Sequence, residues 1–181
     1  MADDIAQRLE QHIPALRRYA FALTRDRDAG DDLVQDCLER ALSRLYLRRH
    51  DGDLRAWLFT LMRNLYIDAY RSRARRGGHV SLDEVAPHEA GALGALAAQD
   101  GGLEARDALK ALDLLPEEQK SLLLLVGVEN LTYQEAARVV GVPLGTVMSR
   151  LARARARLRA LIDGTLKGEE AARGPVLRRV K

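Results

Sequence analysis

The sequence contains a single cysteine, Cys37, among its 181 residues. One thiol excludes an internal disulfide and removes the usual thiolate zinc sites. The four histidines are scattered along the chain and do not add a convincing set of ligands. We therefore expect neither a metal site nor a bound cofactor.

Long apolar runs are also missing. No stretch approaches the roughly 20 apolar residues that a membrane-spanning helix needs. The amino end, MADDIAQRLEQ, lacks the basic start and apolar core of a signal peptide. These features predict a cytoplasmic protein that does not insert into membranes.

Strand patterns and catalytic motifs are absent as well. Alternating β-branched runs do not occur, so no Gly-rich phosphate loop can follow a strand. No Ser/His/Asp or Cys/His arrangement falls in a plausible site. The sequence predicts an all-α protein that works by binding and is not an enzyme.

What the sequence does contain is two blocks of helix-period apolar residues. The first predicts a small helical domain over residues 1–76, and the second predicts another over 103–163. The Gly- and Ala-rich stretch between them, 77–102, predicts a flexible linker, and the polar residues 164–181 predict a mobile tail. Two small domains on a tether are expected.

Three helical segments are predicted in the first domain. One covers Asp4 to Leu23, with Pro14 either as a kink or at the first position of a second helix. The next runs from about Ala29 to Leu45. It has an apolar face and an acidic stripe formed by Asp32, Asp36 and Glu39. By itself, this stripe also fits a solvated helix face with i,i+4 ion pairs.

The third segment begins after Asp53, a plausible N-cap, and ends in an arginine cluster that also suits a helix C-terminus for electrostatic reasons alone. Its spacing predicts two faces. The predicted buried stripe is Leu54, Trp57, Leu58, Leu61 and Leu65, and the other face carries Thr60, Arg63, Asn64, Ile67 and Arg71.

The second domain contains a predicted helix-turn-helix after helices over about Leu103–Leu114 and Pro116–Val128. Thr132 and Glu135 have capping-box spacing, Gly141 can enter a left-handed turn, and Pro143 can start the next helix. The residues predicted to pack the two helices together are Ala136, Ala137, Val140, Val142, Val147 and Leu151. The second helix of such a motif lies in the DNA major groove. Its acid-free run of arginines indicates nucleic acid, although a solvated face is the alternative.

Taken in order, DAGDDLVQDCLERAL, LRAWLFTLMRNLYIDAYRSR and LPEEQKSLLLLVGVENLTYQEAARVVGVPLGTVMSRLARARARLR resemble the extracytoplasmic-function (ECF) sigma factors of bacterial RNA polymerase. The resemblance implies a three-helix-type region 2 bundle and a four-helix region 4 domain. It also implies promoter-specific, stress-responsive transcription initiation under an anti-sigma factor.

The resemblance assigns roles to residues on the helices already described. The core-polymerase surface, which meets the β′ clamp helices and β, would comprise Asp32, Gln35, Asp36 and Glu39. Minus 10 promoter DNA would meet Arg63, Asn64, Ile67 and Arg71. The minus 35 element would meet Thr146, Ser149, Arg150, Arg153 and Arg157. Met148 and Ala152 depart from the larger or basic side chains of many members, so contacts there would be weak or apolar.

Two alternatives stay open. A free-standing helix-turn-helix regulator would explain residues 132–159 but would assign no function to the first domain. A sigma-like mimic that sequesters an anti-sigma factor would have no transcriptional activity of its own.

Overall fold

The computed structural model describes residues 7–44, 53–75 and 102–165, and no strand occurs within them. The fold is all-α, as predicted. The helices are α2 (Ile13–Thr24), α3 (Arg27–Arg44), α4 (Leu54–Arg75), α6 (Gly102–Asp113), α7 (Glu117–Gly127), α8 (Tyr133–Val140) and α9 (Leu144–Ile162). Most of the predicted linker and tail lies outside the described residues. No helix in the described ranges is both long and apolar enough to cross a membrane.

The N-terminal domain consists of α2, α3 and α4. Pro14 lies in the first turn of α2, which confirms the interpretation that it starts a second helix rather than kinking one long helix. Asp53 caps α4 as predicted, because its Oδ1 accepts hydrogen bonds from the backbone N–H groups of Arg55 at 2.9 Å and Ala56 at 3.3 Å.

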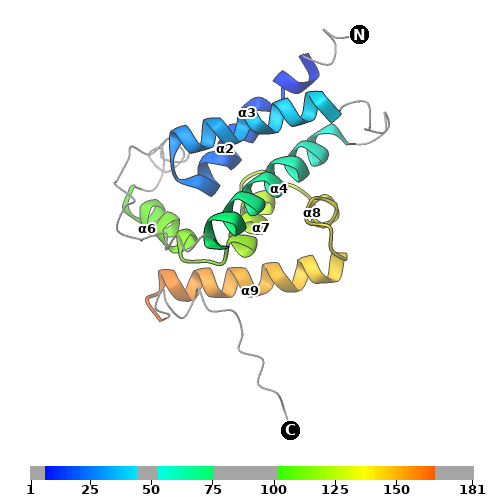
Figure 1. Cartoon of the computed structure of the whole chain (residues 1–181). Coiled ribbons are helices and arrows are strands. Elements are labelled where there is room, and N and C mark those ends of the chain that lie inside the picture. The colour runs from blue at the N-terminus through cyan, green and yellow to red at the C-terminus, as the bar shows by residue number, and fades with distance from the viewer. Residues whose placement is uncertain (1–6, 45–52, 76–101, 166–181) are drawn as a thin grey trace.

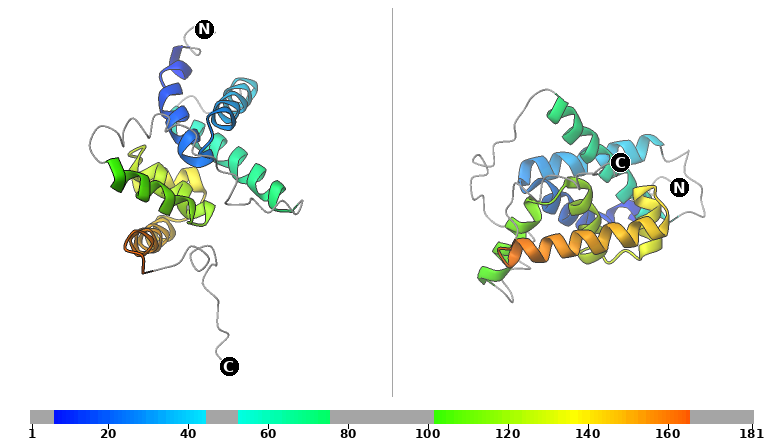
Figure 2. Two further views of the ribbon diagram at one scale, coloured as in Figure 1. Left: turned by 90° about the vertical axis from the view of Figure 1, so that its left-hand side faces the viewer. Right: turned by 90° about the horizontal axis from the view of Figure 1, so that it is seen from below.

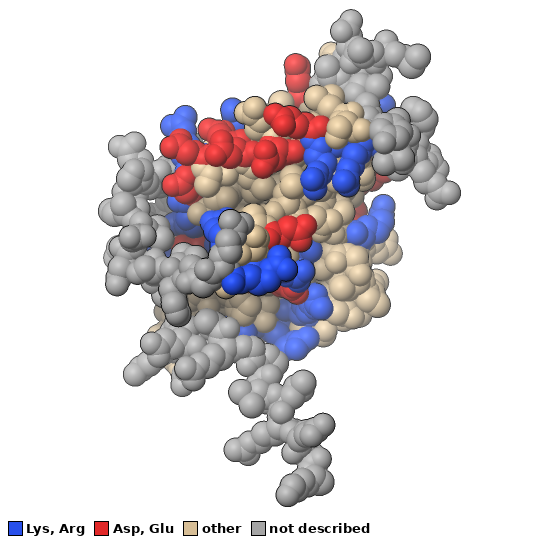
Figure 3. Space-filling view, in the orientation of Figure 1, with Lys and Arg blue, Asp and Glu red and all other residues tan. Residues whose placement is uncertain are grey.

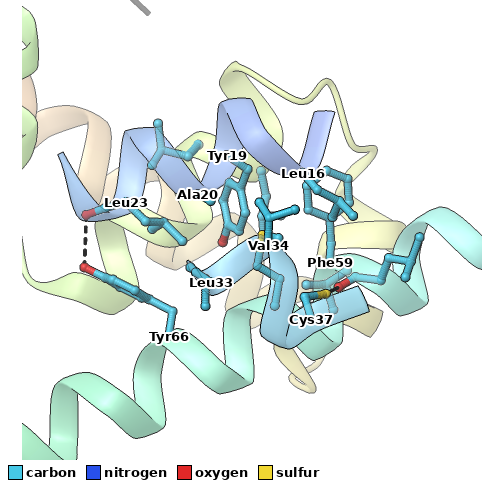
Figure 4. Close-up of a cluster of buried hydrophobic side chains, with 14 of the residues drawn as sticks. Leu16, Tyr19, Ala20, Leu23, Leu33, Val34, Cys37, Phe59 and Tyr66 are labelled. Carbon is cyan, nitrogen blue, oxygen red and sulfur yellow. Dashed lines mark hydrogen bonds between the residues drawn. The ribbon is translucent and has the colours of Figure 1, made fainter. Parts of the chain in front are cut away.

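Apolar side chains from all three helices meet in one core. Figure 4 shows Leu16, Tyr19 and Leu23 of α2 pointing toward α3 and α4. The Tyr19 and Phe59 rings pack edge to face with centroids 5.3 Å apart. α2 and α3 approach so closely that a Cβ at Gly30 would lie 2.3 Å from the Phe21 ring, which explains why glycine occupies this position.

The C-terminal domain consists of α6 to α9 and contains the predicted helix-turn-helix. Thr132 Oγ1 accepts from the Glu135 backbone N–H at 3.2 Å, and Glu135 Oε2 accepts from the Thr132 backbone N–H at 2.7 Å. Gly141 ends α8 with φ of 72°, in the left-handed region. All six predicted packing residues belong to one apolar cluster, which Leu122 of α7 completes. Figures 1 and 2 show α9 lying along one side of the molecule.

The two domains are packed together rather than merely tethered. α4 lies against α8, and α2 lies against α7. Leu124, Leu125, Leu131 and Val139 of the C-terminal domain join the same buried cluster as the N-terminal core. The described residues therefore form a closed arrangement with a continuous apolar interior.

The predicted buried stripe of α4 packs against the core, but it is narrower than the face that the fold covers. Leu54 and Leu58 are buried, and Trp57, Leu61 and Leu65 are half-buried against the same core. The buried face also includes Ala56, Phe59, Met62, Arg63, Tyr66 and Ile67. The reason is that α4 has neighbours in both domains, so a larger part of its circumference is covered than one helix face would need.

Candidate functional surfaces

The acidic face of α3, formed by Asp32, Gln35, Asp36 and Glu39, is exposed. Gln35 Nε2 donates to Glu39 Oε1 at 3.3 Å. Asp32 and Asp36 make no ion pair or side-chain hydrogen bond with any described residue. In Figure 3, acidic side chains gather over α3. Arg40 lies four residues after Asp36 but forms no ion pair with it, so the i,i+4 pairing of a solvated face does not neutralise this carboxylate.

The opposite side of α3 is held by apolar packing. Leu33, Val34, Cys37 and Ala41 are buried against α2 and α4. The Cys37 thiol donates to the carbonyl of Leu58 at 3.6 Å, and burial raises its pKa to about 12. The thiol therefore stays protonated and packs as a small apolar group.

Of the predicted minus 10 residues on α4, the structure exposes two and buries two. Asn64 and Arg71 are exposed, but Arg63 is only 7% exposed and Ile67 only 4%. The expectation that all four share an open face is therefore wrong for this arrangement. Helical spacing explains it, because Arg63 lies one turn from Phe59 and from Tyr66, both of which are buried. The Nε of Arg63 has no hydrogen-bond partner among the described residues.

Glu129 is the centre of a polar contact between the domains. Its side chain is 0% exposed and receives two hydrogen bonds from the Arg18 guanidinium, at 2.9 and 2.8 Å. Arg55 donates to the Glu129 backbone carbonyl and lies 3.8 Å from its carboxylate. The Arg55 guanidinium also stacks over the Phe59 ring. A buried carboxylate needs such partners because desolvation penalises its charge.

Further polar contacts continue this interdomain seam. Tyr66 donates its hydroxyl to the Leu23 carbonyl, drawn in Figure 4, and to Glu117. Lys120 Nζ donates to the Leu23 carbonyl at 2.9 Å and to Asp113 at 3.0 Å. Tyr19 and Ser121 share a hydrogen bond of 2.8 Å. Burial raises the pKa of both tyrosines, and the Glu117 carboxylate raises that of Tyr66 further, so both remain neutral donors.

Glu129 was not predicted as a contact residue, although the sequence around it carries one signal. No Lys or Arg occurs between Lys120 and Arg138, so Glu129 has no cation close to it in the sequence. An acid inside an otherwise apolar stretch, LLLLVGVENL, needs a partner from elsewhere in the fold if it is buried.

The predicted minus 35 residues lie on α9. Ser149 and Arg153 are exposed, whereas Thr146 and Arg157 are partly covered. Arg150 lies 3.6 Å from Glu118, and Arg157 donates to Gln119 at 3.4 Å. Glu118 also pairs with Arg71 of α4 at 2.9 Å. One exposed carboxylate thus contacts a predicted promoter-binding arginine from each domain.

The electrostatics of α9 favour a polyanion. Val147, Leu151 and Ala154 bury one side of the helix, and the arginines lie outside that side. No Asp or Glu occurs from Leu144 to Ile162, so the positive charge is not neutralised within the helix. Such a surface fits phosphates, which half or more of protein–DNA hydrogen bonds contact.

Comparison with known proteins identifies both halves of the chain. The family described as "Sigma2 domain of PhyR" matches residues 9–63, and "Sigma-70, region 4" matches residues 105–158. The "ECF RNA polymerase sigma factor EcfG" of Rhodopseudomonas palustris is 36% identical over 91% of this chain and 89% of its own length. SigM of Mycobacterium tuberculosis is 32% identical over 86% and 76%.

Solved structures agree with these matches. The sigma factor RpoE from Bartonella quintana, in complex with the anti-sigma factor NepR, has a TM-score of 0.73 and 35% identity, covering 88% of this chain and 97% of that one. CnrH, in complex with the cytosolic domain of CnrY, has a TM-score of 0.67 and 27% identity, covering 92% of each chain. The chain belongs to the ECF sigma factors of bacterial RNA polymerase.

Proposed function

We propose that this protein is an alternative sigma factor that binds core RNA polymerase and directs promoter-specific, stress-responsive initiation. The observation that carries the proposal is that one chain combines an exposed acidic face on α3 with a helix-turn-helix whose second helix is acid-free and basic. Polymerase performs the phosphoryl transfer, so this chain is not an enzyme. Because it acts with polymerase on DNA, its place of action is the cytoplasm.

The α3 face contacts the polymerase. Asp32, Gln35, Asp36 and Glu39 present their side chains to the β′ clamp helices. All four side chains are exposed, and Asp32 and Asp36 have no partner within residues 7–44, 53–75 and 102–165, which supports this assignment. Asp32 and Asp36 can therefore form ion pairs with a partner protein without first breaking a contact to another described residue.

The minus 10 element is bound by α4. Asn64, which is exposed and offers both donor and acceptor, contacts a base that has been taken out of the stack. Arg71 contacts the backbone after leaving Glu118. Arg63 and Ile67 are buried in the arrangement described, so they take part only after a rearrangement exposes that side of α4.

The minus 35 element is bound by α9. Ser149, Arg150 and Arg153 contact base edges, with Thr146 beside them and Arg157 on the backbone. Opening also frees Arg71 from Glu118, whereas Arg150, which lies in the same domain as Glu118, keeps that contact. Promoter binding by both domains and closure of the interdomain seam are therefore competing states.

An anti-sigma factor controls this equilibrium. Two similar sigma factors, RpoE of B. quintana and CnrH, have been solved in complex with NepR and with the cytosolic domain of CnrY. A regulator of this kind would cover the acidic face, the arginine face or both.

A sigma-like mimic is the second candidate. The family that matches residues 9–63 is named for PhyR, and PhyR of B. quintana is called an anti-anti-sigma factor in its complex with NepR. A mimic binds the anti-sigma factor and supports no transcription.

Run-off transcription separates these functions. Core polymerase is supplied with a library of promoter-like duplexes, with and without this protein. We expect transcripts only with both components, from templates that share two motifs at fixed spacing. Folded, inhibitor-free protein that yields no transcript would contradict the sigma-factor proposal. Tight binding to a palindrome by the isolated protein would favour a regulator instead.

A further inference from the structure

The outward side of α9 begins with apolar residues that the fold does not use. Leu144 is 39% exposed and Met148 is 52% exposed, and neither belongs to either hydrophobic cluster. They are four residues apart and therefore neighbours on one side of the helix, and the exposed Ala152 continues the row. We call Leu144, Met148 and Ala152 the apolar strip.

A glycine that the internal packing does not explain lies beside this strip. Gly145 lies in the first turn of α9, and a Cβ placed there would meet nothing within 4 Å. Packing inside the protein therefore does not require glycine. Glycine is a poor helix former, so its presence fits a site where a partner approaches the helix backbone closely.

The surroundings favour DNA over an apolar protein surface as the occupant. Arg150 and Arg153 follow the strip on a helix that has no acid, so a partner that covers it also meets concentrated positive charge. In the second helix of a helix-turn-helix, the N-terminal residues face base edges in the major groove. The apolar group displayed there is the C5 methyl of thymine.

We propose that Leu144 and Met148 read thymine methyl groups in the minus 35 element, with Gly145 permitting the close approach. This inference rests on the proposed function and deepens it, because it assigns specificity to residues outside the polar set Ser149, Arg150 and Arg153. Ser149 fits this division, since its hydroxyl already donates to the Thr146 carbonyl at 3.0 Å. Thymine is then distinguished from cytosine mainly by apolar contact.

The test removes single methyl groups from the DNA. In a promoter obtained from the run-off library, each thymine of the upstream motif is replaced in turn by deoxyuridine, which lacks only the methyl. Binding of holoenzyme, formed from core polymerase and the full chain, is then measured. We expect about a fourfold loss of affinity at one or two positions, the value for one buried methyl-sized group.

Variants identify which side chain senses the methyl. Met148→Ala or Leu144→Ala should weaken binding to the thymine template and no longer distinguish it from the deoxyuridine template. Ile162→Ala is the matched control, because Ile162 is 50% exposed at the far end of the same helix. Gly145→Ala should keep or raise thermal stability yet lower promoter affinity, which a purely structural role would not produce.

Four results would overturn the inference. The first three are an upstream motif without thymine, affinities that no deoxyuridine changes, and undiminished methyl sensitivity in both alanine variants. The fourth is an equal loss on thymine and deoxyuridine templates together with weaker polymerase binding, which would indicate that a protein binds the apolar strip. Failure of the proposed function looks different, because no template would then be transcribed.

Discussion

Carboxylates serve opposite purposes in α3 and in the C-terminal domain. Asp32 and Asp36 are exposed and have no partner among the described residues. Glu117 and Glu129 accept hydrogen bonds from residues of the N-terminal domain, and Glu129 is completely buried. The same chemical group, a carboxylate, therefore holds the two domains together in the C-terminal domain and has no partner among the described residues on α3. This contrast is the reason that we assign the proposed polymerase contact to carboxylates without a partner among the described residues, and not to acidic residues in general.

The largest effect should come from reversing the free carboxylates. We expect Asp32→Arg with Asp36→Arg to weaken core-polymerase binding about 1000-fold, on the order of 4 kcal/mol, because two attractive contacts become repulsive. Thermal stability should be unchanged, since neither residue has a partner in the part of the chain that the structure describes. Binding is measured by fluorescence anisotropy of labelled protein. Asp68→Arg, the same type of substitution at one exposed position of α4, is the control for each single variant, Asp32→Arg and Asp36→Arg, and an equal loss in that control would contradict a specific α3 surface.

Breaking the buried pair should instead change stability. Arg18→Met leaves the Glu129 carboxylate without its main partner, and we expect the free energy of unfolding to fall by about 3 kcal/mol. Arg17→Met is a matched control one residue away, because the Arg17–Asp31 pair is exposed and should contribute less than about 1 kcal/mol. Urea unfolding measures both. Adding Glu129→Gln to Arg18→Met should recover part of the lost unfolding free energy. If the double variant instead loses the sum of the two single-variant costs, the two side chains are not coupled.

The seam should also make stability fall in alkaline solution. The pKa values of Tyr19 and Tyr66 are raised by burial. Above the unfolded tyrosine pKa of about 10, the unfolded chain loses protons that the native state keeps, so stability falls by up to about 1.4 kcal/mol per pH unit for each tyrosine. Tyr66→Phe should remove the contribution of Tyr66 to this fall in stability with pH and leave that of Tyr19. Urea unfolding from pH 9 to 11 measures it, and identical slopes in both proteins would contradict a buried Tyr66.

The smallest effect concerns Glu135, an acid that is bound within its own domain. Thr132→Ala removes the capping box of α8 and should cost about 1 kcal/mol at neutral pH. Hydrogen bonds from Thr132 lower the pKa of Glu135, so this contribution is present above the unfolded pKa and is lost as pH falls through the folded value. The cost of the substitution should therefore shrink toward pH 3. A cost independent of pH would mean that the carboxylate takes no part in the cap.

Local signals predicted the helix-turn-helix well. The capping box, the left-handed Gly141 and the six packing residues all depend on neighbours within about 20 residues of sequence, and the structure confirms them. The α4 stripe was harder to predict, because its neighbours come from both domains. Periodicity detects one buried face and cannot show that a second domain covers part of another.

By itself, the sequence determined the all-α fold, the helix caps, the acidic face of α3 and the basic face of α9, because these follow from short-range spacing and side-chain type. Only the tertiary structure decided which charges are used internally. The partners of Glu129 come from residues 111 and 74 positions away, and Glu118 joins Arg71 to Arg150. Pairs at such separations depend on how helices pack in three dimensions, which no local pattern in the sequence specifies.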